Sequence, residues 1–127
     1  MKDNKNCFVY IILCEDNSYY TGITNNLINR FKKHSNGSGA YYTKFHKPLK
    51  YLSAWKVENL NIALSIEYYI KSVNKKIKTI FIQNNRLLKT YYIKYIKDKN
   101  KNLNISIRSI SKKDIDKINT IIKNKNF

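Results

Sequence analysis

The feature that most constrains this fold is an unbroken apolar run near the N-terminus. Cys7–Cys14 (CFVYIILC) is rich in β-branched and aromatic residues and has the length of a β-strand. A polar cluster follows at residues 15–18, and residues 19–23 have the composition of a second strand. We therefore expect an antiparallel hairpin. Because the first strand is apolar at nearly every position, we expect it to be covered on both faces within a sheet.

The following segments predict helices on this sheet and one more strand. Thr24 and Asn25 supply an N-cap signal for the first helix, and residues 35–40 (SNGSGA) are expected to form a loop. Helical periodicity covers residues 26–34, 59–75 and 76–88. Residues 49–57 are aromatic and partly alternating, as in a third strand. The predicted fold class is α/β, with a small three-stranded antiparallel sheet flanked by helices.

The composition changes beyond residue 88. We therefore divide the chain into a domain at residues 6–87 and a basic extension, rich in Ile, Lys and Asn, at residues 88–127. Residues 97–104 are typical of a linker, and residues 103–110 alternate partly like a strand. Ser111 and Asp114 resemble a capping box that opens an amphipathic helix to about Lys123. We expect a folded extension whose isoleucines pack on the core, with a protein partner as the alternative.

The charge balance indicates a polyanionic partner. The chain has 25 Lys and Arg against 8 Asp and Glu, a net charge of +17. An AT-rich genome that fills surfaces with lysine is the alternative. Nucleic acid is favoured over a membrane surface because tyrosines, which can stack on bases, are interspersed with the basic residues. No apolar run is long enough for a membrane span, and Cys7 and Cys14 are expected as buried free thiols, so we expect a cytoplasmic protein.

The few carboxylates limit the metal chemistry that is open to this chain. Glu67 stands out because it lies beside the apolar stripe of the 59–75 helix, where an unpaired carboxylate is costly. It either binds a hard divalent metal ion or pairs with a neighbouring lysine. An acidic cluster for two metal ions is not expected, so a single-metal site is the remaining option.

Cationic and phenolic side chains offer further chemistry. Arg30 and His34 lie one turn apart on the first predicted helix, where a guanidinium can bind phosphate and an imidazole can transfer a proton. A solvated helix face is the alternative. Tyr10 and Tyr20 lie in the two hairpin strands, where they either pack or orient a water molecule.

Together these segments resemble a known family. Phe8-Val9-Tyr10, then nine residues, then Tyr20-Thr21-Gly22 resembles the paired signature of the GIY-YIG nuclease superfamily. The segments TGITNNLINRFKKH and NGSGAYYTK, a basic stretch with proline, and a helix with a central Glu are similar to its small stand-alone bacterial branch. The resemblance covers residues 6–82. The first triplet departs from it, since FVY keeps only the tyrosine of GIY.

The resemblance implies an endonuclease that hydrolyses DNA phosphodiester bonds with one divalent ion, Mg²⁺ or Mn²⁺. It implies a catalytic set of Tyr10, Tyr20, Arg30, His34 and Glu67, with Gly22 as a structural glycine. One tyrosine is the candidate general base, Arg30 binds the developing charge, and Glu67 holds the metal ion. His34 matches a position where relatives carry His or Tyr. Asn84 or Asn85 could match a late asparagine of some relatives.

DNA is the expected partner, with RNA as an open alternative. Phosphate contacts are expected from the lysines Lys44, Lys47, Lys50, Lys89, Lys94, Lys97, Lys99 and Lys101. Tyr41 and Tyr42 either stack on an unpaired base or pack in the core. Two rival functions are a non-catalytic nucleic-acid-binding module and a partner-dependent accessory subunit of a DNA repair complex.

Overall fold

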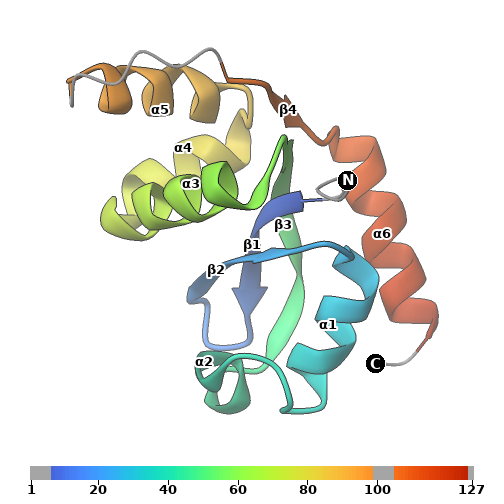
Figure 1. Ribbon diagram of the computed structural model, residues 1–127. Coiled ribbons are helices and arrows are strands. Elements are labelled where there is room, and N and C mark those ends of the chain that lie inside the picture. Colours follow the sequence, from blue (N-terminus) through green and yellow to red (C-terminus); the bar gives the residue numbers. More distant parts are fainter. Residues whose placement is uncertain (1–6, 99–104, 126–127) are drawn as a thin grey trace.

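The apolar N-terminal run is strand β1 (Cys7–Cys14), and it lies inside the sheet, as predicted. The computed structural model describes residues 7–98 and 105–125 and shows an antiparallel sheet in the order β2-β1-β3-β4 (Figure 1). The other strands are β2 (Tyr19–Thr24), β3 (Pro48–Val57) and β4 (Ile107–Ser109). The predicted α/β class is confirmed. The sheet has four strands rather than three because a short segment of the C-terminal part pairs with the free edge of β3.

Helices cover both faces of the sheet, so successive β1 side chains are buried on opposite sides. Val9 and Ile11 pack in the core cluster formed with α3, α4 and α5. Tyr10 and Ile12 point the other way, into a cluster formed with α1 and α6. Figure 1 shows these two groups of helices on opposite sides of the sheet. This alternation explains a strand without polar positions, and it places the Tyr10 hydroxyl on the α1 side.

Two helices follow the hairpin. Helix α1 (Leu27–Ser35) agrees with the predicted helix to within one residue at each end. Its N-cap is Asn26 rather than Thr24 or Asn25, because the Asn26 side chain accepts a hydrogen bond from the backbone N–H of Asn29. The glycine-containing loop leads into α2 (Tyr41–Phe45), a single short helix that the sequence analysis did not predict. A five-residue helix leaves almost no periodicity to detect, which explains the omission.

Three helices occupy the stretch for which two were predicted. They are α3 (Leu60–Ser72), α4 (Lys75–Gln83) and α5 (Leu87–Asp98). The predicted boundary near residue 75 was displaced because the Asn74 side chain caps a new helix by accepting from the N–H of Ile77. Helix α5 was missed, although Leu88, Tyr92 and Ile96 recur every four residues and are all buried.

The C-terminal helix is α6 (Lys112–Asn124), and its capping prediction is confirmed. The Ser111 hydroxyl accepts from the N–H of Asp114 at 3.1 Å. Ile115 and Ile122 are buried, whereas Ile121 is exposed. The Asn119 side chain bonds both backbone groups of Tyr51 in β3, each at 2.9 Å. Helix α6 is therefore fixed to β3, on the same side of the sheet as α1.

Smaller predictions concern the cysteines, the membrane and the tail lysines. Cys7 and Cys14 are buried and free, as expected. Within residues 7–98 and 105–125, no helix is long and apolar enough to cross a membrane. Lys99 and Lys101, most of the predicted linker at 97–104 and the first two residues of the strand predicted at 103–110 lie outside the described residues.

Candidate active site

A buried hydrogen-bond chain joins β1, α1 and α2. The Tyr10 hydroxyl lies 2.8 Å from Nε2 of His34, and Nδ1 of His34 lies 2.6 Å from the Thr43 hydroxyl. The Thr43 hydroxyl donates to the carbonyl of Ala40 at 3.1 Å. Tyr10, His34 and Thr43 are at most 3% exposed. Two residues that the sequence places 24 positions apart are thus in direct contact.

Burial keeps this chain uncharged. It raises the pKa of Tyr10 against the opposing hydrogen bond from Arg30, so the phenol keeps its proton at neutral pH. Burial, and then the positive charge of Arg30, lower the pKa of His34 to about 4. A neutral phenol beside a neutral imidazole is therefore the resting arrangement.

Arg30 connects the buried chain to the surface. Its Nε donates to the Tyr10 hydroxyl at 3.5 Å, and its side chain is only partly buried. Burial lowers the pKa of the guanidinium, but the interactions with Tyr10 and then Tyr20 outweigh it and leave this pKa raised. Arg30 also lines an open surface cavity, and the described residues of its walls include three cationic side chains and no carboxylate. A permanent positive charge is thus held by tyrosines at the edge of a polar hollow.

Two glycines allow this close packing. A Cβ on Gly22 would lie 2.7 Å from Cζ of Tyr10, since these two residues face each other across the hairpin. A Cβ on Gly39 would lie 2.7 Å from Nδ1 of His34. The structural role that the resemblance implied for Gly22 thus has a steric basis here. Gly39 has the same relation to His34, and the sequence analysis did not single it out.

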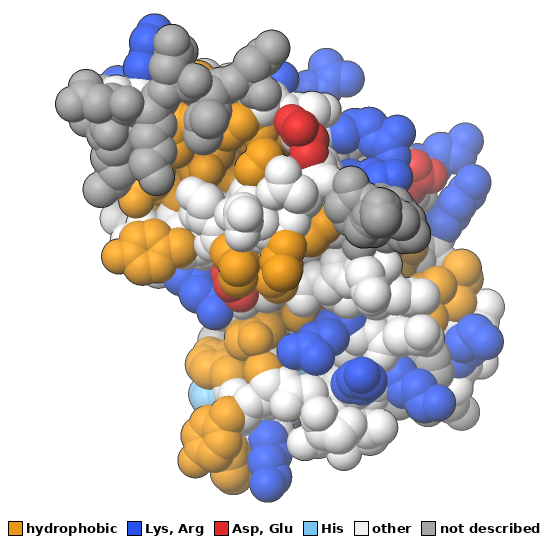
Figure 2. All heavy atoms as spheres, viewed as in Figure 1, with side chains coloured by type: hydrophobic (Ala, Val, Ile, Leu, Met, Phe, Trp, Pro, Cys, Tyr) orange, Lys and Arg blue, Asp and Glu red, His pale blue; other side chains and the backbone are white. Residues whose placement is uncertain are grey.

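Tyr20 lies at the rim of the site. Its ring packs against Tyr10 and His34, with centroid distances of 6.3 and 5.2 Å, yet the side chain is only partly buried. Tyr42 of α2 stacks on it at 5.7 Å, and His46 stacks on Tyr42 at 3.9 Å. The surface is indented between α3 and α2 in Figure 2. Of the two signature tyrosines, Tyr20 is the one that solvent reaches.

Glu67 of α3 is paired with a lysine, which was one of the two alternatives for it. Its Oε2 lies 3.2 Å from Nζ of Lys71, and its side chain is 18% exposed. The same Nζ lies 5.7 Å from the ring centre of Tyr20, so Lys71 brings Glu67 beside the rim of the site. Among the described residues, no group of three or more His, Cys, Asp or Glu side chains could hold a metal ion. One carboxylate still fits Mg²⁺, which binds through one or two carboxylates and keeps several waters.

The comparison with protein families agrees with this arrangement. The profile of the GIY-YIG catalytic domain matches residues 6–81. The chain belongs to the GIY-YIG family. The match ends within α4, so the GIY-YIG region holds every residue of the candidate site. Domains of this family are generally endonuclease domains.

Similar GIY-YIG proteins occur in several bacteria. The UPF0213 protein YazA of Bacillus subtilis is 38% identical over 84 residues, which cover 66% of this chain and 85% of that protein. The UPF0213 protein CPE1444 of Clostridium perfringens is 43% identical over 89 residues, covering 70% and 96%. The solution NMR structure of the UPF0213 protein BH0048 of Bacillus halodurans is 34% identical, covers 61% of this chain and 82% of that one, and has a TM-score of 0.41.

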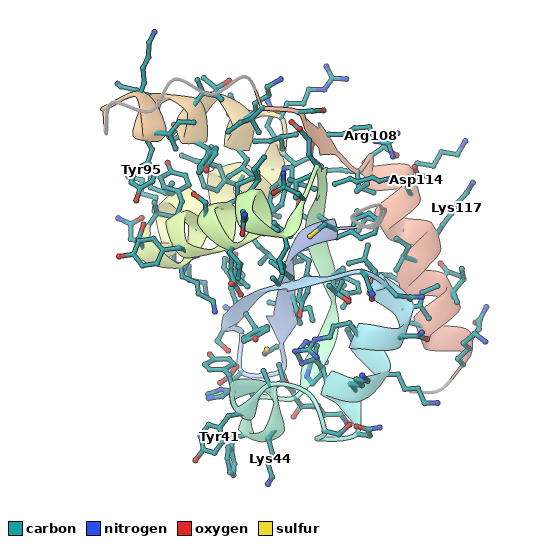
Figure 3. All side chains as sticks on the ribbon, viewed as in Figure 1. Tyr41, Lys44, Tyr95, Arg108, Asp114 and Lys117 are labelled. Carbon is teal, nitrogen blue, oxygen red and sulfur yellow. The ribbon has the colours of Figure 1, made fainter. Side chains whose placement is uncertain are left out.

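The lysines predicted to contact DNA lie outside the buried chain. Lys44, Lys47 and Lys50 are exposed, on α2, after it, and in β3. Tyr41 and Lys44 point away from the body of the GIY-YIG domain in Figure 3. Tyr42 is instead half-buried against Tyr20.

The two late asparagines, Asn84 and Asn85, lie between α4 and α5 and stabilise the fold in this structure. The Asn85 amide donates to the carbonyl of Ile110, and the Asn85 carbonyl accepts from Nε1 of Trp55, both at 2.7 Å. Asn84 is the C-cap of α4. Asn85 therefore holds the turn after α4 to the C-terminal part of the chain.

Two polar neighbours of the site were not found from sequence. Thr43 was overlooked because its partner lies nine residues earlier, across a loop, and a single threonine carries no pattern. Lys71 was foreseen only as an unspecified lysine near Glu67. The i,i+4 spacing of the two was a usable signal, since such pairs lie on one helix face.

Proposed function

We propose that this protein is an endonuclease that hydrolyses DNA phosphodiester bonds and depends on one divalent ion, Mg²⁺ or Mn²⁺. The observation that carries the proposal is the position of Arg30. Its guanidinium is hydrogen-bonded to buried Tyr10 and reaches the rim where Tyr20 and the Glu67–Lys71 pair lie. A fixed cation at a hollow whose described lining residues include no carboxylate suits a phosphate under attack.

The reaction is in-line attack by water on phosphorus. The water oxygen bonds to phosphorus, the bond from phosphorus to the 3′-oxygen breaks, and a 5′-phosphate and a 3′-hydroxyl result. Arg30 binds the negative charge that builds up on the non-bridging oxygens. The partly exposed Tyr20 accepts a hydrogen bond from the attacking water and orients it. The proton of the water passes to solvent as the new bond forms, and the departing 3′-oxygen takes up a proton from solvent. Tyr10 accepts a hydrogen bond from Arg30, and His34 bonds the Tyr10 hydroxyl in turn, so these two residues position the guanidinium.

Glu67 would hold the metal ion. A bound Mg²⁺ supplies positive charge beside the phosphate and the departing oxygen. The Glu67 carboxylate is 18% exposed and lies 3.2 Å from Nζ of Lys71, so a bound cation would compete with this lysine for the carboxylate. The remaining ligands would be water and phosphate oxygens, as Mg²⁺ prefers.

The exposed lysines would hold the DNA backbone. Lys44, Lys47 and Lys50 can reach phosphates without reading sequence, and the net charge of +17 favours approach to a polyanion. Binding of this kind weakens steeply with salt. We assign specificity for a DNA structure or sequence to none of these residues.

The testing experiment is a cleavage assay on a panel of substrates. Supercoiled plasmid, single strands, flaps and branched junctions, with one RNA strand, are incubated with Mg²⁺, Mn²⁺ or chelator. Wild type is compared with Glu67→Gln and with Glu15→Gln, a control carboxylate in the exposed β1–β2 turn. We expect metal-dependent DNA cleavage that is lost in Glu67→Gln and kept in Glu15→Gln.

Other results would redirect the proposal. Salt-sensitive binding without any cleavage would replace it with a non-catalytic binding module. Cleavage by Glu67→Gln at the wild-type rate and with the wild-type metal requirement would remove Glu67 from the metal site. Faster cleavage of RNA than of any DNA would change the substrate class.

A further inference from the structure

We propose that Thr43 is the positioning residue that fixes the tautomer of His34 and thereby directs the Tyr10 hydroxyl and Arg30. Its effect on cleavage rests on the proposed nuclease function, whereas its effect on His34 does not. Thr43 comes from α2, a separate element from the two strands and two helices that carry Tyr10, Tyr20, Arg30, His34 and Glu67. Helix α2 therefore contacts the buried side of the site through Thr43, which bonds His34.

The number of hydrogens available to Thr43, His34 and Tyr10 decides the direction of the hydrogen bonds between them. A threonine hydroxyl has one hydrogen to donate, and Thr43 gives it to the carbonyl of Ala40 at 3.1 Å. Towards His34, at 2.6 Å, the hydroxyl can then only accept, so the hydrogen between them belongs to Nδ1. A neutral imidazole carries a single N–H. Nε2 of His34 is therefore bare, and it accepts the proton of the Tyr10 hydroxyl at 2.8 Å.

Because the Tyr10 hydroxyl donates to His34, its oxygen is able to accept a hydrogen bond from Arg30. The phenol gives its hydrogen to His34 and keeps its lone pairs for the N–H of Arg30 Nε at 3.5 Å. With the other tautomer, His34 and Arg30 would both donate to Tyr10, and the phenol hydrogen would need another acceptor inside the core. An unpaired buried donor is costly. The Thr43–Ala40 bond therefore sets the direction of every bond up to Arg30.

Burial prevents solvent from replacing Thr43. Thr43 is 3% exposed and His34 is 1% exposed. Gly39 closes the space beside Nδ1, where even a Cβ would lie 2.7 Å away. The imidazole stays neutral because burial, and then the charge of Arg30, lower its pKa, so the tautomer is defined at neutral pH. No water of ordinary size fits between Thr43 and His34 at 2.6 Å.

The first test reads the tautomer directly and needs no activity. The chain has two histidines, so the two-bond ¹H–¹⁵N spectrum of ¹⁵N-histidine-labelled protein at pH 7 resolves His34 from His46. We expect the Nδ1–H tautomer in wild type and in Thr43→Ser, and a mixture or the Nε2–H tautomer in Thr43→Val. Thr120→Val is the matched control, because the Thr120 hydroxyl bonds only within its own helix α6. A pure Nδ1–H tautomer in Thr43→Val, or an Nε2–H tautomer in wild type, would overturn the proposal.

The second test separates positioning from folding. In single-turnover cleavage, Thr43→Val should lower the rate about tenfold with unchanged DNA affinity, and Thr43→Ser should stay within about twofold of wild type. If Thr43→Val does not fold, Thr43→Ala replaces it in both tests with the same expectation. A lower rate without a change of tautomer would count against the assignment. If no variant and no wild type cleaves, the nuclease proposal fails while the tautomer still decides the role of Thr43.

Discussion

The two halves of the site differ in how fully their polar atoms are already bonded within the protein. We call the α1 side the prepared half and the α3 side the unprepared half. On the α1 side, Tyr10, His34 and Thr43 are buried, and each polar atom among them has a partner within the protein. On the α3 side, Glu67 is paired with a half-exposed lysine, Lys71. The difference indicates a division of labour. Under the proposed function, the protein would fix the phosphate-binding charge in advance and leave the other charge to be completed by a ligand, as expected when catalysis relies on preorganised electrostatics.

Removing Arg30 should give the largest effect and breaks the prepared half. Arg30→Ala is expected to lower the single-turnover cleavage rate by about 10²–10³-fold, since comparable transition-state donors are worth that much. Binding of DNA should change little because many exposed lysines remain. Rates and affinities are measured on the same substrate, with Arg108→Ala in exposed β4 as the control. Equal loss of binding and cleavage would show that Arg30 only anchors DNA.

The pH dependence of the free energy of unfolding tests whether His34 is shielded from water in the folded protein. His34 has its pKa lowered to about 4 by burial and then by Arg30, against 6.5 for an ordinary histidine. Between these values the unfolded chain binds more protons, so the free energy of unfolding falls as the pH drops from about 6.5 towards 4. The loss is at most roughly 3 kcal/mol. Denaturant unfolding at pH 4–8 should show it in wild type and in His46→Gln but not in His34→Gln. Parallel curves for all three would show that His34 titrates normally.

Gly22→Ala tests how tightly the prepared half is packed. The new Cβ would lie 2.7 Å from Cζ of Tyr10 and 3.1 Å from Cε2 of Tyr20, and Tyr10 is wholly buried. Overpacking of this kind costs about 1–3 kcal/mol and should also slow cleavage by moving the Tyr10 hydroxyl. Gly37→Ala is the contrast, since it has open space and only a positive φ of 82°, worth about 1–2 kcal/mol. Thermal unfolding and cleavage are measured together, and equal behaviour of both variants would contradict the steric argument.

The strands could be predicted because their signals are local. The apolar run of β1 and the turn after it dictate a hairpin, and the Ser111 cap marked α6. The β4 pairing was out of reach, because it joins segments about fifty residues apart through backbone bonds that three residues do not specify. The break before α4 was misplaced because apolar periodicity continues through Asn74, whose cap acts against it.

The site divides in the same way. The residues Tyr10, Tyr20, Arg30, His34 and Glu67 were singled out from their chemistry and position, and a family resemblance supplied their predicted catalytic roles. The structure brings the first four together on one face of the hairpin. Their roles in catalysis remain predictions. Thr43 and Gly39 could not be found, since what makes them matter is contact with His34 across a loop. A contact across a loop leaves no recognisable pattern in the neighbouring sequence.

The smallest expected effect concerns the unprepared half. Lys71→Gln removes the partner of Glu67, and stability should change by less than about 1 kcal/mol because the lysine is half exposed. Mn²⁺ binding, followed by electron paramagnetic resonance without DNA, should tighten by about three- to tenfold, since a positive charge near the carboxylate is gone. Lys76→Gln, at an exposed position of α4, is the control. The gain must vanish in the double variant Lys71→Gln/Glu67→Gln. If it persists there, the ion binds elsewhere, and the contrast between a prepared phosphate side and a metal-completed side is lost.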